Sequence, residues 1–134
     1  MNYKAKILII EDMEVQRFLL KQALLSFRII VDEAENGKIA LEKLVQNRDY
    51  DGIITDVDMP VMNGIEATKK IRKLGFKNPI IGFSSMSEDE DIAKGLNAGM
   101  DAYLKKTADY DVIRKMLEDL DILEKEEEEE EIPI

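Results

Sequence analysis

The chain contains no cysteine and no histidine, and each absence excludes a class of chemistry. Without cysteine it can form no disulfide and has no thiolate to act as a nucleophile. Without histidine it lacks the commonest general base, a common metal ligand and the side chain that carries phosphate in phosphohistidine. Chemistry in this protein must therefore rest on carboxylates, hydroxyls and lysine.

Long apolar runs and an excess of positive charge are missing too. No run approaches the roughly 18 apolar residues of a membrane span, and the residues after Met1 lack the apolar core of a signal peptide. The formal net charge of -10 would be repelled by nucleic-acid phosphates and by anionic lipid. We therefore expect a cytoplasmic protein that neither enters a membrane nor binds nucleic acid.

The length of 134 residues suits one domain, and a content of 45% hydrophobic and 36% charged residues is typical of a globular one. The composition changes after Leu123, where Glu124 and Lys125 precede a run of glutamates and a final Ile-Pro-Ile. Like charges at helical spacing repel one another, which favours a solvated tail. We expect a folded domain over residues 1–123 and an acidic C-terminal tail over residues 124–134.

Short apolar runs rich in isoleucine alternate with longer stretches whose apolar residues have helical spacing. The short runs predict buried strands at residues 5–10, 29–31, 52–55, 80–83 and 102–104. The longer stretches predict helices with apolar inward faces. These faces carry, in chain order, Val15, Phe18, Leu19 and Ala23; Ala40, Leu41, Leu44 and Val45; Ile65, Thr68 and Ile71; Ile92, Ala93 and Leu96; and Val112, Ile113, Met116, Leu117 and Leu120. The alternation predicts an α/β domain with a doubly wound, five-stranded parallel sheet.

Polar residues stand where the predicted strands end. Glu11 and Asp12 follow the first strand and Asp56 follows the third, while Ser84 and Lys106 come at the ends of the fourth and fifth. The carboxyl ends of parallel strands form one edge of the sheet, where α/β proteins bind ligands. Each residue alone is an ordinary strand-end residue, but the set brings three carboxylates, a hydroxyl and an ammonium group to one edge.

Three crowded carboxylates repel one another, so at least one would stay protonated unless a cation lay among them. Oxygen ligands favour Mg2+, with Mn2+ as a substitute. A lysine would balance the charge of an incoming phosphoryl group, and a serine hydroxyl would donate a hydrogen bond to it. These are the groups needed to form an aspartyl phosphate.

Four segments carry a family resemblance: ILIIED, DGIITDVDMPVMNGIEA, PIIGFSS and GMDAYLKK. Over about residues 4–123 the sequence resembles the receiver domain of bacterial two-component response regulators, the family of the chemotaxis response regulator. The resemblance implies a flavodoxin-like (βα)5 fold with strand order 2-1-3-4-5. It also implies a signalling phosphoacceptor rather than a turnover enzyme, which catalyses only its own phosphoryl transfer and slow autodephosphorylation.

The same resemblance implies a phosphoacceptor and a metal site. Asp56 corresponds to the phosphoacceptor of the family. Mg2+ or Mn2+ would be held by Glu11, Asp12, Asp56 and the backbone carbonyl of Asp58. Aspartate is commoner in the family at the position of Glu11, and we expect the longer side chain to reach the metal through a water.

The resemblance also implies roles for residues around the phosphoryl group. Ser84 and Lys106 would bind that group, and Ser84 would act with Tyr103 as the switch. Asp58 and Met86 occupy positions that tune the rate of hydrolysis in this family. The surface formed by the fourth helix, fifth strand and fifth helix would carry the output.

The implied partners are a phosphate donor and a downstream protein target. Because this chain has no histidine, the donor would be another protein, a histidine kinase or a histidine phosphotransfer protein, or a small acyl phosphate. We expect a monomer or weak dimer. The sequence leaves open a stand-alone regulator, a relay station and a piece of a larger hybrid kinase.

Two alternatives are weighed against this hypothesis. Haloacid-dehalogenase-like phosphatases use an Asp-x-Asp motif, which Asp56-Val57-Asp58 fits. Those enzymes place the nucleophile on the first strand and the acidic pair last, whereas here the acidic pair comes first, and their usual cap domain would not fit in 134 residues. A phosphorylation-independent pseudo-receiver would keep the fold as an interaction module. The complete set of acids, hydroxyl and lysine argues against that second alternative.

Overall fold

The computed structural model describes residues 5–59, 61–85 and 89–125. Within these ranges, strands and helices alternate along the chain. They are β1 (Ala5–Ile10), α1 (Glu14–Ser26), β2 (Ile29–Ala34), α2 (Gly37–Gln46), β3 (Gly52–Asp56), α3 (Gly64–Lys73), β4 (Ile80–Ser84), α4 (Asp89–Ala98), β5 (Ala102–Lys105) and α5 (Tyr110–Asp119). Among these described residues, no helix is both long and apolar enough to span a membrane.

The strands form one parallel sheet in the order β2-β1-β3-β4-β5, which confirms the predicted fold. The register aligns the strand ends that matter for the site. Ile10 of β1 is paired with Thr55 of β3, and Asp56 is paired with Phe83 of β4. Residues that follow β1, β3 and β4 therefore emerge at the same edge of the sheet.

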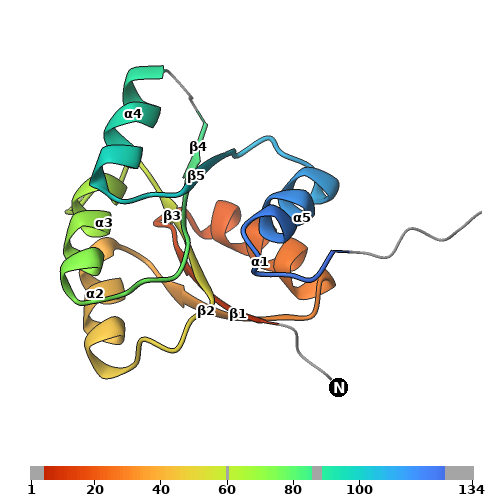
Figure 1. Cartoon of the computed structure of the whole chain (residues 1–134), viewed down its shortest axis with the longest axis horizontal. Helices are drawn as coiled ribbons and strands as arrows, with labels where there is room; N and C mark the ends of the chain where they lie inside the picture. The colour runs from red at the N-terminus through yellow and green to blue at the C-terminus, as the bar shows by residue number, and fades with distance from the viewer. Residues whose placement is uncertain (1–4, 60, 86–88, 126–134) are drawn as a thin grey trace, which may run out of the picture.

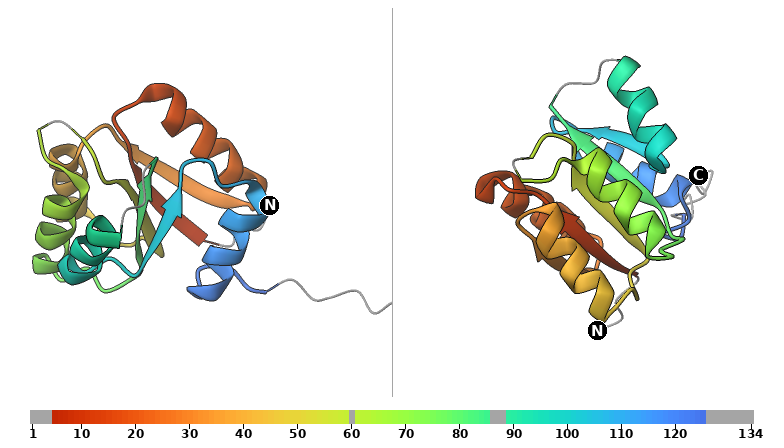
Figure 2. Two further views of the ribbon diagram at one scale, coloured as in Figure 1. Left: turned by 90° about the horizontal axis from the view of Figure 1, so that it is seen from above. Right: turned by 90° about the vertical axis from the view of Figure 1, so that its left-hand side faces the viewer.

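Helices cover both faces of the sheet, as Figures 1 and 2 show: α1 and α5 lie on one face, and α2, α3 and α4 lie on the other. Successive side chains of a strand point to opposite faces of the sheet. Because helices cover both faces, the whole run from Ile7 to Ile10 is fully buried. Ile7 and Ile9 pack in the core beneath α1 and α5, whereas Leu8 and Ile10 pack in the core beneath α2 and α3.

Three of the helices begin at side-chain caps. Asn36, Asn63 and Asp109 each accept a hydrogen bond from the backbone N–H three residues later, at the starts of α2, α3 and α5. Such caps satisfy backbone donors that have no partner inside the helix. The cap at Asn63 fixes where the chain resumes regular structure after the loop that follows β3.

The predicted inward face of the first helix is confirmed for Ala23 and wrong for its other three residues. Val15, Phe18 and Leu19 are 67%, 57% and 55% exposed, and α1 buries Leu20 and Leu24 beside Ala23. Apolar residues cover so much of this helix that spacing alone fits more than one face. Contact with the sheet decides which face is buried, and that contact is not visible to a local pattern.

The fourth helix also departs from its prediction. Ala93 and Leu96 are exposed, and α4 buries Gly95 and Ala98, which carry too little apolar surface to dominate the pattern. Elsewhere the predicted faces are confirmed in their central residues and wrong at their edges. Buried as predicted are Ala40, Leu44, Thr68, Ile71, Ile113 and Leu117, whereas Val45 and Val112 are exposed.

The second strand is longer than predicted, reaching Ala34 rather than ending at Val31. Its last residues include Asp32 and Glu33, which are half-buried. The sheet order makes β2 an edge strand, where charged side chains are common because one side of the strand is open to solvent. The prediction was based on apolar runs, so it ended the strand where the polar residues begin.

Candidate functional site

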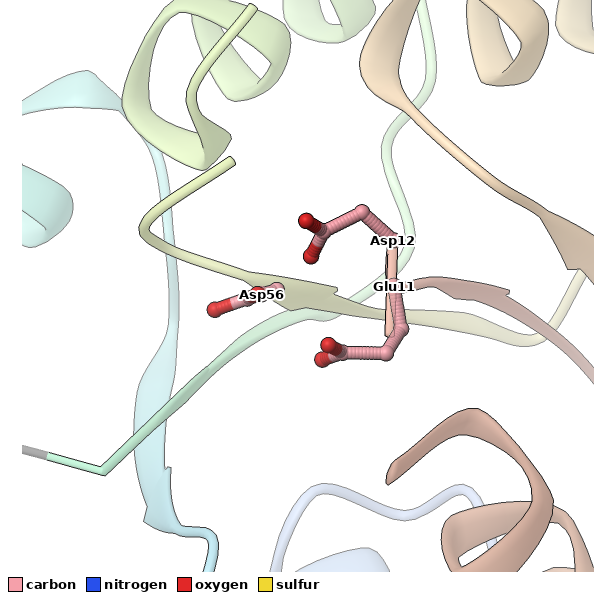
Figure 3. A group of neighbouring side chains, drawn as sticks. All are labelled: Glu11, Asp12 and Asp56. Carbon is pink, nitrogen blue, oxygen red and sulfur yellow. The ribbon is translucent and has the colours of Figure 1, made fainter. Parts of the chain in front are cut away.

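Three carboxylates meet at the edge of the sheet formed by the ends of β1 and β3. Glu11 and Asp12 follow β1 directly, and Asp56 is the last residue of β3. Each offers one oxygen, and these oxygens all lie within 4.8 Å of one another. Figure 3 shows the three side chains projecting toward a common space from the two strand ends. The predicted convergence is therefore present in the fold.

The lysine that follows β5 reaches the same cluster. Lys106 Nζ lies 3.1 Å from Glu11 Oε2 and 3.2 Å from Asp56 Oδ2. Its backbone N–H donates to the carbonyl of Ser84 at 2.9 Å, so the chain continues alongside β4 before the lysine turns into the site. Asp12 has no ion pair with this lysine among those found in the described residues.

Glu11 is fully buried, and its carboxylate is incompletely satisfied. Lys106 Nζ donates a hydrogen bond to Oε1 at 3.3 Å. Oε2 is closer to the ammonium group, but among the described residues no donor meets it in hydrogen-bonding geometry. A buried anionic oxygen without a hydrogen bond is costly. This oxygen and the all-carboxylate donor set fit a hard divalent cation.

Burial dominates the protonation of this cluster. It raises the pKa of Glu11 from 4.5 to about 7, helped by the charge of Asp56 and opposed by Lys106. It also raises the pKa of Asp56, against the lowering effect of Lys106. Burial acts to lower the pKa of Lys106, but the two carboxylates outweigh it and raise that pKa. One ammonium group thus faces two buried carboxyl groups that resist ionisation together.

The loop after β3 holds Asp56 in place. The backbone N–H of Asp58 donates to Asp56 Oδ1 at 3.2 Å. The start of α3 packs against the end of β3, where the Gly64 N–H donates to the carbonyl of Val57 at 2.9 Å. A Cβ at Gly64 would overlap the carbonyl oxygen of Asp56, so only glycine allows this approach.

One residue of this loop has an unfavourable backbone conformation. Val61 has φ of 73° and is 80% exposed. A β-branched residue is strained at positive φ because its Cβ lies close to the backbone. Its side chain is mostly exposed, so little burial offsets this cost.

The predicted switch residues lie on neighbouring strands. Ser84 is buried at the end of β4, in register with Lys105 of β5. Tyr103 of β5 is half-buried. The prediction for Met86 lies outside the described residues.

The Tyr103 ring lies between two glycines. A Cβ at Gly82 of β4 would lie 3.1 Å from the ring, and a Cβ at Gly95 of α4 would overlap its hydroxyl. That hydroxyl donates a hydrogen bond to the backbone carbonyl of Asp91, also in α4, at 2.9 Å. Gly95 was not among the predicted site residues, although a glycine inside a predicted helix is itself a signal of close packing.

Several large apolar side chains of α1 and of the residue before it are exposed. Phe18 and Leu19 are more than half exposed, and Met13, next to the acidic pair, is 55% exposed. A groove of about 160 Å³ runs between α1 and the start of α5 and reaches Lys106. Its lining includes Leu19 and Tyr110. Contiguous apolar patches on a protein surface often mark sites that bind other proteins.

A family model described as response regulator receiver domain matches residues 7–118. The two-component response regulator ORR41 of Oryza sativa subsp. japonica is 37% identical over 107 residues, covering 75% of this chain and 82% of that protein. Chemotaxis protein CheY of Halobacterium salinarum is 37% identical over 101 residues, covering 75% and 83%. Sensor protein EvgS of Escherichia coli is 40% identical over 117 residues, and this chain spans only 10% of it.

Solved structures agree with the sequence comparisons. The chemotaxis protein CheY4 of Vibrio cholerae superposes with a TM-score of 0.82 and 30% identity, covering 87% of this chain and 98% of that one. The receiver domain of the histidine kinase CKI1 from Arabidopsis thaliana, complexed with Mg2+ and BeF3-, superposes with a TM-score of 0.75 and 28% identity. The covered shares are 85% of this chain and 90% of that one.

Proposed function

Because the chain belongs to the response regulator receiver domain family of two-component systems, we propose that Asp56 accepts a phosphoryl group from a partner's phosphohistidine. The observation that carries this proposal is the convergence of Glu11, Asp12 and Asp56 with Lys106 at one edge of the sheet. Asp56 is the carboxylate of the three that extends from β3 and is oriented by the loop after it.

The transfer follows from the position of Asp56. A carboxylate oxygen of Asp56 attacks the phosphorus in line with the bond to the donor's imidazole. The new O–P bond forms as the N–P bond breaks, and the released imidazole takes up a proton from solvent. Lys106, 3.2 Å from Asp56, favours the ionised nucleophile and then neutralises charge on the phosphoryl oxygens.

A divalent cation belongs to this proposal. Glu11, Asp12, Asp56 and the backbone carbonyl of Asp58 would hold it, and the Mg2+ in the related CKI1 receiver structure supports the assignment. When bound, Mg2+ or Mn2+ would supply positive charge that offsets the carboxylates and the phosphoryl oxygens.

Residues around Asp56 would change conformation when Asp56 is phosphorylated. Ser84 donates to the phosphoryl group and moves toward it, and Tyr103 changes rotamer in response. The contact of Tyr103 with α4 supports this coupling, because a change in the ring must alter its packing on that helix. The surface of α4, β5 and α5 then carries the output to a downstream protein. Asp58 and Met86 tune hydrolysis of the aspartyl phosphate.

A protein donor fits the surroundings of the site. Met13 directly follows the acidic pair and is more than half exposed, and Leu19 lines the groove that reaches Lys106. A histidine kinase or phosphotransfer protein would contact both side chains as it approached Asp56. Residues 1–123 would form this receiver domain, and residues 124–134 would form an acidic tail. The receiver carries out its own transfer and slow autodephosphorylation and turns over no separate substrate.

Labelling with a small acyl phosphate tests the role of Asp56. Acetyl phosphate with Mg2+ should add one phosphoryl group to the unaltered protein, measured by intact-protein mass spectrometry. Asp56→Asn should abolish the labelling, whereas Asp49→Asn, a change at an exposed carboxylate outside the cluster, should leave it intact. Full labelling of Asp56→Asn would reject the assignment, and an unlabelled wild-type chain would favour the phosphorylation-independent module.

A further inference from the structure

We propose that Arg17 is a positioning residue that holds the acidic pair in the geometry needed to bind a divalent cation. Its Nη1 donates a hydrogen bond to the backbone carbonyl of Glu11 at 2.8 Å. Arg17 lies in the first part of α1 and has no contact with the carboxylate oxygens of the cluster among the interactions found for the described residues. The inference rests on the proposed function, since it assumes that the cluster binds a metal.

The hydrogen bond from Arg17 acts on the peptide that joins the two acidic residues. This peptide is planar, so the direction of the Glu11 carbonyl also fixes the plane from which Asp12 begins. On the preceding side, the backbone N–H of Glu11 donates to the carbonyl of Ala34 in β2 at 3.1 Å. The segment is thus held by β2 on one side and by the guanidinium of Arg17 on the other.

Arg17 is itself held in place. Its Nε lies 3.5 Å from Glu33 Oε1 on β2, and Lys21 Nζ lies 3.2 Å from the other oxygen of Glu33. The Arg17 side chain is 16% exposed, against 35% for Lys21. A guanidinium with several fixed donors can bridge Glu33 and the Glu11 carbonyl together, which a lysine ammonium on a flexible stem does less well.

Positioning and simple charge predict opposite effects on metal affinity. Arg17 and Lys21 are both cationic, and both would repel a divalent cation bound nearby. If charge alone mattered, loss of either side chain would strengthen binding. If Arg17 positions the acidic pair, its loss weakens binding, because groups that orient metal ligands commonly contribute about tenfold or more to affinity.

The experiment compares Mg2+ affinity in matched variants of the full chain, measured by NMR titration of backbone amides. Arg17→Met should bind Mg2+ about tenfold more weakly than the unaltered chain. Lys21→Met removes the same charge from the same Glu33 partner without touching the Glu11 carbonyl, and its affinity should be unchanged or slightly higher. Arg17→Lys keeps the charge and should be weakened to an intermediate extent.

A second readout needs no metal. In chelator, the amide signals of Asp12 and Met13 should shift in Arg17→Met and stay in place in Lys21→Met. Affinity in Arg17→Met equal to or tighter than that of the unaltered chain would overturn the inference while leaving the metal site intact. An unaltered chain that binds no Mg2+ would instead reject the proposed function, and this inference with it. If Arg17→Met fails to fold, the Mg2+ affinity of Arg17→Lys is compared with that of the unaltered chain instead. Weaker binding supports the inference, and equal or tighter binding overturns it.

Discussion

The ammonium group of Lys106 lies 3.1 Å from the buried carboxylate of Glu11, a residue 95 positions earlier in the chain. The same nitrogen lies 3.2 Å from Asp56, so it serves two carboxylates that are almost fully buried. Coulombic attraction at such distances offsets the cost of removing these groups from water only while all partners remain. The stability of the metal-free domain should therefore depend strongly on this lysine.

Replacing Lys106 by methionine should lower the free energy of unfolding by about 3 kcal/mol in chelator, because two buried carboxylates lose their cationic partner. Mg2+ should restore part of this loss by supplying positive charge to the same cluster. Urea denaturation at pH 8, with EDTA or with Mg2+, measures both effects. Lys115→Met provides the control, since its ion pair is exposed and should contribute less than about 1 kcal/mol. Equal stability of the two variants in chelator would contradict the prediction.

Stability in the absence of a cation should fall as the pH rises from about 5 to 7. Burial and the charge of Asp56 raise the pKa of Glu11 from 4.5 to about 7. Between these values the folded chain binds more protons than the unfolded chain, so deprotonation favours unfolding. The contribution of this residue is at most about 3 kcal/mol.

Urea denaturation across this pH range in EDTA measures the dependence on Glu11. Glu11→Gln removes the titrating group and should flatten the pH dependence in that window. A free energy of unfolding that rises with pH between 5 and 7 in the unaltered, metal-free chain would rule out a raised pKa. Mg2+ should reverse the trend, because the cation binds the ionised carboxylates.

Gly95→Ala should destabilise the protein because the added Cβ meets the hydroxyl of Tyr103. Overpacking of this kind costs about 1–3 kcal/mol, which exceeds the gain of about 1 kcal/mol from replacing glycine in a helix. In a Tyr103→Ala background the collision is gone, and the same substitution should become stabilising. A double-mutant cycle measured by urea denaturation gives the coupling between the two positions. Additive effects would mean that the ring does not occupy the space beside Gly95.

Val61→Asn should stabilise the protein by about 1 kcal/mol, because asparagine tolerates the left-handed conformation far better than a β-branched residue. The side chain is mostly exposed, so little burial is lost. Thermal or urea unfolding measures the gain. A loss of stability would indicate that the valine side chain supports the loop in a way that outweighs its backbone strain.

Strand positions and strand-end residues were predictable because buried parallel strands have short, continuous apolar runs in their sequence. Glu11, Asp56 and Lys106 follow such runs immediately, and the parallel topology then brings them together. The inward faces of α1 and α4 were not predictable from spacing. In α1 the apolar residues exceed one face, and in α4 the buried residues are glycine and alanine.

The residues that orient the site carboxylates could not be predicted from the sequence, for a different reason. Arg17 acts on a backbone carbonyl, and Asp58 acts through its backbone N–H, so neither contact depends on a recognisable pattern of side-chain types. Tyr103 was predicted from the family resemblance, but the position of its ring between Gly82 and Gly95 depends on how closely α4 approaches the sheet. Such distances arise from packing between segments that are remote in the chain.

The uncovered side chains of α1 also constrain how this protein behaves at high concentration. Val15, Phe18 and Leu19 are more than half exposed in a chain of net charge -10, and like charge of this size opposes association between molecules. Electrostatic repulsion decays over about 8 Å at physiological ionic strength, whereas attraction between apolar surfaces is not screened. Concentrated electrolyte should therefore favour self-association through this helix more than dilute buffer does.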